Sequence, residues 1–403
     1  MVVRIAARGD GVTAAGRHIP LTAPGDAIGE DGSIAPGPYR AVPPCRHFPE
    51  CGGCQLQHVD DRAYAAFLTD RIANALDAQG VAVPEILAPH ISPPNSRRRA
   101  SLRAERRGGQ LLLGFNEEGS HRIVDMRECH ILRPELFALV DPLRRLLASL
   151  LPPRGSGGAR LTLTDQGADV LLDKVSADSL ESSEAITAFA KQHRLARLAL
   201  DDGYGAQTRW EPEPVTATLG GVAVALPQGA FLQATEDGEA ALVAAVHEAI
   251  GPAATVADLF AGIGTFAFSL SGRVYAAEAA RDSALALKGA ANRAQRPIFV
   301  DHRDLFRRPL DEKELNRFEA VVIDPPRAGA KEQAALLARS GVPRIAAVSC
   351  NPATFARDAK ALIEGGYRLA WVKPVGQFRW STHVELVGAF TRGGEAGSSP
   401  RAA

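Results

Sequence analysis

The carboxyl-terminal part of the chain, residues 231–393, alternates short apolar runs with longer segments of helical periodicity. The apolar runs are rich in β-branched side chains and are bounded by Gly, Pro or polar residues, which is typical of buried strands. We expect strands at Thr255–Phe260, Arg273–Ala277, Ile298–Val300, Ala320–Asp324, Ile345–Val348 and Leu386–Phe390, with a helix directly after Phe266. This alternation predicts an α/β domain built on a parallel, Rossmann-like sheet.

Residues 45–230 mix helical and extended patterns and predict a central α+β domain. Helices are expected over Asp60–Gln79, Leu132–Leu151 and Ser183–Gln192, and strands over Arg160–Asp165, Ala168–Asp173, Leu195–Leu200 and Val222–Leu226. We expect these strands to form one mixed sheet. No catalytic constellation falls within residues 131–230, so that part is expected to position the substrate or to support the fold.

The two ends of the chain carry weaker patterns. Residues 1–44 hold short apolar pieces separated by turn-forming pairs such as Gly9-Asp10 and Pro24-Gly25, which predicts a small barrel or meander followed by a Pro-rich linker. A plain structural lid fits the same pattern. Residues 394–403 are mostly small or polar and are expected to be disordered.

Composition adds limits to this picture. The 403 residues carry 46 basic and 46 acidic side chains, so any surface for nucleic acid must be a local patch. No apolar run reaches the roughly 20 residues that cross a bilayer, and the amino terminus lacks the apolar region of a signal peptide. We therefore expect a cytoplasmic protein of two or three domains that is a monomer and does not contact membranes.

Four of the five cysteines are placed like ligands of a metal centre. Cys45, Cys51 and Cys54 lie on one short loop, in which Gly52 and Gly53 allow the backbone to wrap closely around an inorganic core, and Cys129 is distant in sequence. Four thiolates satisfy zinc or an iron-sulfur cluster. Zinc sites usually use two close pairs of cysteines, so three clustered thiols and one distant thiol favour a structural [4Fe-4S] cluster.

The most basic segment is Ser96–Arg107, which contains six arginines and one glutamate. Guanidinium groups contact phosphates with forked, permanently charged donors, although most charge runs are only solvated faces. Apolar residues interrupt this run, and the strand-like piece Leu111–Phe115 follows it. Some of the arginines are thus expected to share one face of a sheet and to contact nucleic acid.

Several expected strands of the α/β domain end in residues that bind ligands. Gly262 and Gly264 follow the first strand and let the backbone approach a ligand, and Glu278 ends the second strand, where it can accept from both ribose hydroxyls. Asp304 follows the third strand and is suited to an adenine amine, and Asp324 ends the fourth. Residue 267 is Ala, so the full dinucleotide glycine motif is absent and S-adenosylmethionine is the better cofactor.

Cys350 stands at the end of the strand Ile345–Val348. The carboxyl ends of strands in an open parallel sheet face the ligand crevice, so this thiol is placed for chemistry. A small buried hydrophobe is the competing interpretation, because most free cysteines are just that. Once the other four cysteines are assigned to one cluster, Cys350 is the remaining thiol.

These motifs together resemble the RNA uracil-C5 methyltransferases, and among them the iron-sulfur branch that carries a TRAM domain and acts on 23S ribosomal RNA. The resemblance covers nearly the whole chain and rests on the four cysteines, on Asp324-Pro325-Pro326-Arg327 and on Ser349-Cys350-Asn351-Pro352. It implies a class I methyltransferase domain over 231–393, a central RNA-binding domain with a [4Fe-4S] site over 45–230, and an abridged TRAM-like module over 1–44. It also implies the following site residues: nucleophile Cys350, base Glu385 in Thr382-His383-Val384-Glu385, cofactor contacts Gln233, Phe260, Gly262, Thr265, Glu278, Asp304 and Asp324, and cluster ligands Cys45, Cys51, Cys54 and Cys129.

The implied chemistry requires a nucleophile and a base. Carbon 5 of uracil is a weak nucleophile, so a thiolate first adds at carbon 6, and a base later removes the proton from carbon 5. The uracil must therefore lie in a single strand or be flipped out.

Three positions depart from the family pattern: Thr235 and Thr265 replace asparagines, and Phe378–Ser381 replaces Phe-Pro-x-Thr. Three alternatives stay open: a tRNA uracil-5 methyltransferase, an RNA cytosine-5 methyltransferase, or a non-catalytic, cluster-bearing RNA-binding factor. The cytosine enzymes are expected to carry a Pro-Cys pair after the aspartate, where this chain has Pro326-Arg327.

Overall fold

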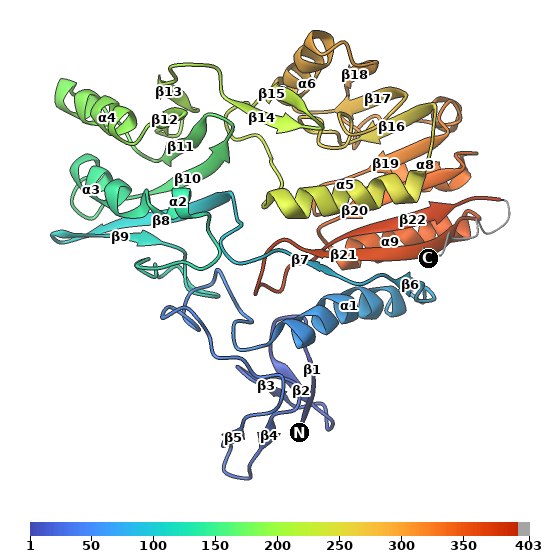
Figure 1. The fold of residues 1–403 in the computed structure, drawn as a ribbon, viewed down its shortest axis with the longest axis horizontal. Helices are drawn as coiled ribbons and strands as arrows, with labels where there is room; N and C mark the ends of the chain where they lie inside the picture. The colour runs from blue at the N-terminus through green and yellow to red at the C-terminus, as the bar shows by residue number, and fades with distance from the viewer. Residues whose placement is uncertain (394–403) are drawn as a thin grey trace. The chain divides into compact units, whose positions relative to one another are not determined.

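The computed structural model describes residues 1–393, which form two compact units (Figure 1). The first unit consists of residues 1–71, 89–241 and 375–384, and the second of residues 72–88, 242–374 and the described residues from 385 onward. Helix α1 (Asp61–Asp77), helix α5 (Glu236–Ile250) and strand β21 (Arg368–Gly376) contribute residues to both. The domain limits expected from the sequence stay a prediction.

The first unit is built around a six-stranded sheet with the order β13-β12-β11-β10-β8-β9. Its strands are β8 (Arg99–Arg107), β9 (Gln110–Gly114), β10 (Ser156–Thr164), β11 (Gly167–Asp173), β12 (Arg197–Asp201) and β13 (Gln207–Trp210). The pair β11–β12 is parallel and the other pairs are antiparallel, so the expected mixed sheet is confirmed. Strand β15 (Val222–Ala225), however, pairs only with β14 (Thr216–Leu219) in a separate hairpin.

Three helices accompany this sheet: α2 (Pro134–Phe137), α3 (Val140–Leu150) and α4 (Leu180–Gln192). The single helix expected over Leu132–Leu151 is wrong, because the helix is interrupted at Ala138 and Leu139. Pro142 has no N–H to donate to the carbonyl of Ala138, so a continuous helix would lose that bond. On α3, Leu143 and Leu147 are fully buried in the unit's core, and each such side chain contributes about 2 kcal/mol.

Small antiparallel sheets form the amino-terminal part of the first unit. Strands β1 (Val2–Ile5), β2 (Gly11–Thr13) and β3 (His18–Ile19) make a three-stranded sheet, and β4 (Ala27–Ile28) pairs with β5 (Ile34–Ala35). Of the two expected forms, the meander is the one observed. The guanidinium of Arg40 forms an ion pair with the buried carboxylate of Asp26 in this part, with an N–O distance of 2.5 Å.

The second unit contains most of a nine-stranded sheet with the order β18-β17-β16-β19-β20-β22-β21-β6, and β7 also pairs with β21. Its further strands are β6 (Glu85–Ile86), β7 (His90–Ile91), β16 (Thr255–Leu259), β17 (Arg273–Glu278), β18 (Ile298–His302), β19 (Ala320–Ile323), β20 (Arg344–Ser349) and β22 (Glu385–Thr391). Strands β16 to β20 are parallel to their neighbours, and β22 runs antiparallel to β20. All six strands predicted in this part are present.

The connections of this sheet are α6 (Arg281–Arg293), α7 (Glu312–Leu315), α8 (Lys331–Arg339) and α9 (Pro352–Glu364). Helix α6 packs on β17 and β18, whereas α8 and α9 lie side by side (Figure 1). The helix expected after Phe266 is wrong: residues 262–269 form turns, because their hydrogen bonds mix spans of three and four residues, and no helix follows before β17. No helix within residues 1–393 is both long and apolar enough to cross a membrane.

Candidate active site

Cys350 and Glu385 meet at one edge of the second unit's sheet. Cys350 follows Ser349, the last residue of β20, and Glu385 is the first residue of β22. The antiparallel register pairs Ser349 with Leu386, so its next position places Cys350 opposite Glu385. Directly opposite residues have Cβ atoms about 5 Å apart. Asp324 follows β19, the parallel neighbour of β20, at the same edge.

The residues around Cys350 hold it between a strand and a helix. Ser349 Oγ accepts from the N–H of Asn351 at 3.1 Å, and Asn351 Oδ1 accepts from the N–H of Ala353 at 3.1 Å, which caps α9. The Asn351 amide also donates to the carbonyl of Arg327 at 3.1 Å, so it ties the Asp324–Arg327 loop to the cysteine loop. Each residue beside the thiol in the Ser-Cys-Asn-Pro motif therefore has a structural role. Ser349 binds the backbone of Asn351, Asn351 caps α9, and Pro352 is the first residue of α9.

Negative charge accumulates around this thiol. Burial raises the pKa of Cys350 to about 11, and the carboxylates of Glu385 and Asp324 add to that effect. Arg327 opposes it. Burial together with Glu385 and Asp258 raises the pKa of Asp324 well above its usual value. Glu385 itself is only 8% exposed. The Cys350 thiol is therefore protonated at neutral pH in this arrangement. A cation close to the sulfur would favour the thiolate.

The turn after β16 forms the next part of the edge. Phe260 adopts a φ of 64°, a left-handed conformation that is strained for an aromatic residue, and its ring lies 5.3 Å from that of Phe306. Glu278, at the end of β17, accepts from the N–H of Gly262 at 2.7 Å and from that of Ala280 at 2.6 Å. Each carboxylate oxygen has a second lone pair, so these bonds leave capacity for a ligand.

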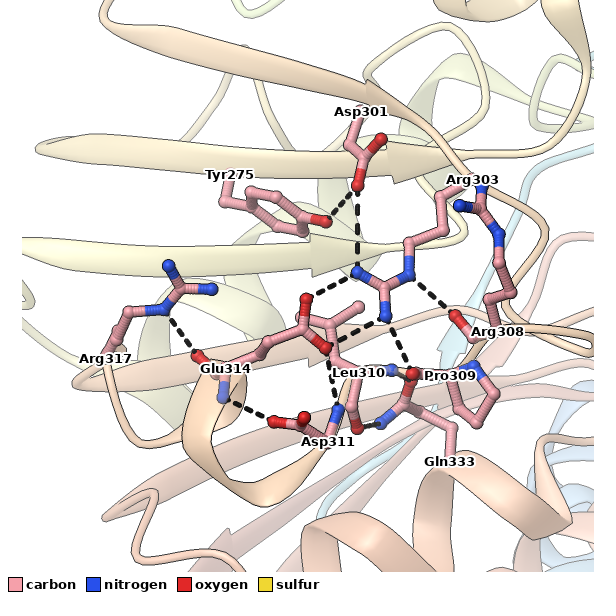
Figure 2. A network of polar contacts seen from close by, with 10 residues as sticks. All are labelled: Tyr275, Asp301, Arg303, Arg308, Pro309, Leu310, Asp311, Glu314, Arg317 and Gln333. Atoms are coloured by element: carbon pink, nitrogen blue, oxygen red, sulfur yellow. Dashed lines mark hydrogen bonds and ion pairs between the residues drawn. The ribbon is translucent and has the colours of Figure 1, made fainter.

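The loop after β18 carries Asp304 and is braced by Arg303 (Figure 2). The Arg303 guanidinium donates to both oxygens of Glu314 at 2.6 and 2.9 Å and to the carbonyls of Arg308 and Pro309 at 2.6 and 2.8 Å. It thereby closes residues 304–310 into a fixed loop. Asp304 Oδ1 accepts from the N–H of Phe306 at 2.9 Å, and its side chain remains partly exposed.

Not all of the predicted cofactor residues lie in the same unit. Phe260, Gly262, Thr265, Glu278, Asp304 and Asp324 belong to the second unit, whereas Gln233 belongs to the first. Gln233 is 3% exposed, and its Oε1 accepts from Gln377 Nε2 at 2.8 Å. Gln377 Oε1 in turn accepts from the N–H of Ala234 at 2.9 Å. Thr265 is partly buried in the turn.

The four clustered cysteines of the first unit line one cavity together with His47, Phe115 and Met126. Burial raises the pKa of all four thiols, that of Cys54 to about 12, and neighbouring thiols add to the effect at Cys45, Cys51 and Cys54. Backbone N–H groups of His47, Gly53 and Ile131 donate toward Cys45, Cys51 and Cys129. Within residues 1–393, no three His, Cys, Asp or Glu side chains converge closely enough to hold a single metal ion.

The glycines of the cysteine loop are required by close packing. A Cβ atom at Gly52 would lie 2.8 Å from the carbonyl oxygen of Asn116, and one at Gly53 would lie 3.2 Å from the Phe115 ring and 3.5 Å from Cys51 Sγ. These contacts are with neighbouring protein atoms, and the expectation that the glycines let the loop wrap around an inorganic core stays a prediction.

The arginine run divides between structural and exposed positions. Arg98 is buried and forms an ion pair with Glu239 at 2.6 Å, and Arg97 lies over the rings of Phe115 and Phe378. On β8, Arg99 and Arg103 alternate with buried Ala100 and Leu102, so they share the outward face. The expectation of a shared face thus holds for part of the run.

Sequence reasoning missed some residues that shape this edge. Asp258 lies inside β16 with no exposed surface, and burial together with Glu278 raises its pKa to about 7. Its signal was a carboxylate within an apolar strand. Arg303 and Gln377 gave no signal, because their partners are distant in sequence.

Comparisons with known proteins show similarity to RNA methyltransferases. The family model described as tRNA (Uracil-5-)-methyltransferase matches residues 296–392. An RNA methyltransferase of Zymomonas mobilis, described as uncharacterized, is 54% identical over 97% of this chain and 99% of its own length. The 23S rRNA (uracil(1939)-C(5))-methyltransferase of Chromohalobacter salexigens is 33% identical over 91% of this chain and 79% of its own length.

The fold has a counterpart among solved structures. The Pyrococcus abyssi tRNA (uracil-54, C5)-methyltransferase, in complex with S-adenosyl-L-homocysteine, gives a TM-score of 0.73 at 21% identity. The match covers 97% of this chain and 99% of that one. At this identity the likeness shows a shared mixed α/β methyltransferase fold.

Proposed function

Since this chain belongs to the family of RNA (uracil-5) methyltransferases, which depend on S-adenosylmethionine, we propose that it methylates carbon 5 of a uridine in 23S ribosomal RNA. Cys350 is the nucleophile and Glu385 is the general base. The observation that carries these roles is the register of β20 and β22, which sets the thiol opposite the carboxylate.

The reaction requires both groups at one uracil. The Cys350 sulfur adds to carbon 6, and the electrons of the 5,6 double bond become an enolate with carbon 5 nucleophilic. S-adenosylmethionine supplies an electrophilic methyl group, and carbon 5 takes it. Glu385 then accepts the proton from carbon 5, the double bond re-forms, and the carbon–sulfur bond breaks to release thiolate. The thiol proton goes to solvent before the addition, the donor leaves as S-adenosylhomocysteine, and Glu385 passes the carbon-5 proton back to solvent, so the enzyme returns unchanged.

Electrostatics supports an ordered reaction. With a pKa of about 11, the Cys350 thiol is protonated near neutral pH while Glu385 and Asp324 are its neighbours. The methyl donor is a sulfonium cation, and a cation beside a thiol favours the thiolate. Donor binding therefore activates Cys350, which suppresses reaction of the thiol before the donor is in place.

The donor is held by residues at the edge of the sheet. We assign cofactor contacts to Phe260, Gly262, Thr265, Glu278, Asp304, Asp324 and Gln233. The strained φ of Phe260 and the bond from Gly262 to Glu278 support the assignment, because they preset a turn at the strand end. Gln233 is supported only by the family resemblance, since its side chain is engaged with Gln377.

The outward face of β8 is suited to RNA. Its residues Arg99, Ser101 and Arg103 are paired in register with Thr162, Arg160 and Gly158 of β10. The guanidinium of Arg99 lies 4.2 Å from the ring of Phe231, which is 54% exposed. Exposed arginine and aromatic groups together bind phosphates and stack on unpaired bases.

Replacing Arg103 by Ala should weaken RNA binding and reduce its salt dependence, and an unchanged salt slope would contradict this role.

Four thiols suit a [4Fe-4S] cluster held by Cys45, Cys51, Cys54 and Cys129. The N–H groups directed at the thiols, the shared cavity and the two close-packed glycines support this fit. Zinc sites usually bring two close pairs of cysteines, whereas here three thiols share one loop and the fourth is distant in sequence, so we favour the cluster. Such a cluster supplies a cross-link between the loop and the distant Cys129.

The target is tested by mapping methylated uridines. Ribosomal and transfer RNA from a strain lacking this gene are compared with RNA from its parent, and each is then incubated with the enzyme and methyl-labelled S-adenosylmethionine. We expect one 23S uridine to lose and regain its methyl group, and the Cys350→Ala variant to restore none. Recovery of the mark in transfer RNA alone would move the substrate to tRNA, and recovery by Cys350→Ala would refute the nucleophile.

A further inference from the structure

The segment 377–384, which links β21 to β22, is held by its carbonyl groups. The hydroxyl of Tyr64 donates to the carbonyls of Phe378 and Ser381, each at 3.1 Å. The N–H groups of Gln55 and Leu56 both donate to the carbonyl of Trp380 at 2.8 Å. All of these residues belong to the first unit, and Tyr64 is fully buried.

The held conformation is a strained one. Trp380 has a φ of 60°, which is unfavourable for a residue with a Cβ atom, so surrounding contacts must maintain it. Its side chain is 8% exposed and packs in the same hydrophobic core as Cys54. Arg379 lies 4.8 Å from the Trp380 ring and donates to Asp61 at 2.5 Å.

The donors that hold Trp380 belong to the cysteine loop. Gln55 and Leu56 directly follow Cys54, and the Gln55 side chain donates to the carbonyl of Gly52 at 2.8 Å. Arg97 lies 5.2 Å from the Phe378 ring and 5.9 Å from that of Phe115, which packs on the same loop. The cysteine loop and the segment 377–384 therefore form one connected set of contacts.

We propose that the cysteine loop, with Tyr64, is the positioning device for the general base. The proposal rests on the function proposed above. Val384 and Glu385 are joined by a peptide bond, so the backbone of the held segment, together with the pairing of β22 with β20, sets the conformation in which Glu385 begins β22. A metal centre held by Cys45, Cys51, Cys54 and Cys129 would keep the loop that holds Trp380 in shape, and its chemical contribution would be this cross-link and not electron transfer.

This role makes a prediction about one step. Addition of Cys350 at carbon 6 and methyl transfer to carbon 5 do not require Glu385 to accept a proton, whereas the final elimination does. A misplaced base would therefore leave methylated RNA attached to Cys350 through the unbroken carbon–sulfur bond. A merely structural defect would lower all steps together and accumulate nothing.

The test compares two buried tyrosines that each donate to backbone carbonyls. Tyr64→Phe removes the bonds to Phe378 and Ser381, and the matched control Tyr367→Phe removes a 2.7 Å bond to Val342, away from the segment. Each variant is incubated with 23S ribosomal RNA and methyl-labelled S-adenosylmethionine and is run on a denaturing gel. We expect Tyr64→Phe to accumulate about tenfold more labelled protein–RNA adduct than the control, with slower turnover. Hydrogen exchange in residues 377–384 should rise with it.

A second variant approaches the contacts from the metal side. Cys54→Ser should raise hydrogen exchange in residues 377–384, a readout that does not depend on activity, and should accumulate the same adduct. Adduct levels equal to the Tyr367→Phe control, or unchanged exchange in both variants, would overturn the proposal. The wild-type protein separates this from failure of the proposed function: if it forms no covalent complex with 5-fluorouridine RNA, the nucleophile assignment itself is wrong.

Discussion

At the scale of single residues, the central feature is a thiol that burial, and after it two neighbouring carboxyl groups, keep protonated. Cys350 lies between two carboxylates, Glu385 and Asp324, and its pKa is raised to about 11. A free cysteine has a pKa of about 8.5, so the folded site lowers the thiolate fraction at every neutral pH. In the proposed reaction the positive charge of the methyl donor lowers the pKa of Cys350 again.

The first prediction concerns alkylation of Cys350 by iodoacetamide, followed by mass spectrometry of its peptide. Because a raised pKa keeps the thiol protonated, the rate should keep rising with pH up to a midpoint near 11. Removing the charge of one neighbour, in Glu385→Gln, should move the midpoint down, whereas the matched substitution of an exposed carboxylate, Asp282→Asn, should not. A wild-type midpoint near 8.5 would contradict the account.

Residue identities at this edge were predictable where a strand end carries a polar group in a distinctive motif. Cys350, Glu278, Asp304 and Asp324 all lie at strand ends or in the loops that follow, as expected. Asp258 was not assigned because it lies inside its strand, whereas ligand-binding residues were sought only at strand ends. Roles for all these residues stay predictions until they are tested.

At the scale of elements, the loop after β18 depends on Arg303, whose guanidinium bonds within the protein. Arg303 holds residues 304–310 through Glu314 and two backbone carbonyls (Figure 2). Its Glu314 partner raises the pKa of the Arg303 guanidinium, so the pair stays ionised. The loop's Asp304 and Phe306 thus depend on this network for their position.

The second prediction is that Arg303→Ala weakens binding of S-adenosylmethionine about tenfold, measured by calorimetry, since several charge-assisted hydrogen bonds are lost. Arg308→Ala is the matched control, because it removes an exposed arginine side chain from the same loop and leaves the carbonyl that Arg303 binds. Equal affinities for the two variants would mean that the loop does not shape the cofactor site.

Elements were predictable where apolar periodicity is strong and local. The strands β16 to β20 and β22 were located within a few residues. The helix expected after Phe266 failed because the turns that begin at Gly262 and Gly264, both with positive φ values, continue to residue 269 with hydrogen bonds of mixed span. Strands β6 and β7 were missed because only pairing with β21, far along the chain, makes two residues a strand.

At the scale of the whole molecule, both compact units are assembled from segments distant in sequence. Residues 375–384 belong with the amino-terminal unit although they lie between two strands of the methyltransferase sheet. No local sequence pattern predicts that residues 375–384 belong to the first unit. Their place there depends on packing of Trp380 and on hydrogen bonds from Tyr64 and Gln55, which are distant in sequence.

The third prediction concerns the metal centre. Anaerobically purified protein should be brown and contain about four iron and four sulfide per chain. Cys51→Ser should lower both contents and the unfolding temperature, whereas the control Cys350→Ser should keep full iron and sulfide. A colourless protein with one zinc per chain would show that the cysteines hold a single ion instead.

The most direct measurement traps the covalent step itself. Fluorine at carbon 5 cannot leave as a proton does, so RNA containing 5-fluorouridine at the target should remain bound to the enzyme after methyl transfer. The account predicts a denaturation-resistant complex that requires S-adenosylmethionine, whose cross-linked peptide contains Cys350, and that Cys350→Ala does not form. A cross-link at another residue, or undiminished methylation of uridine RNA by Cys350→Ala, would contradict it.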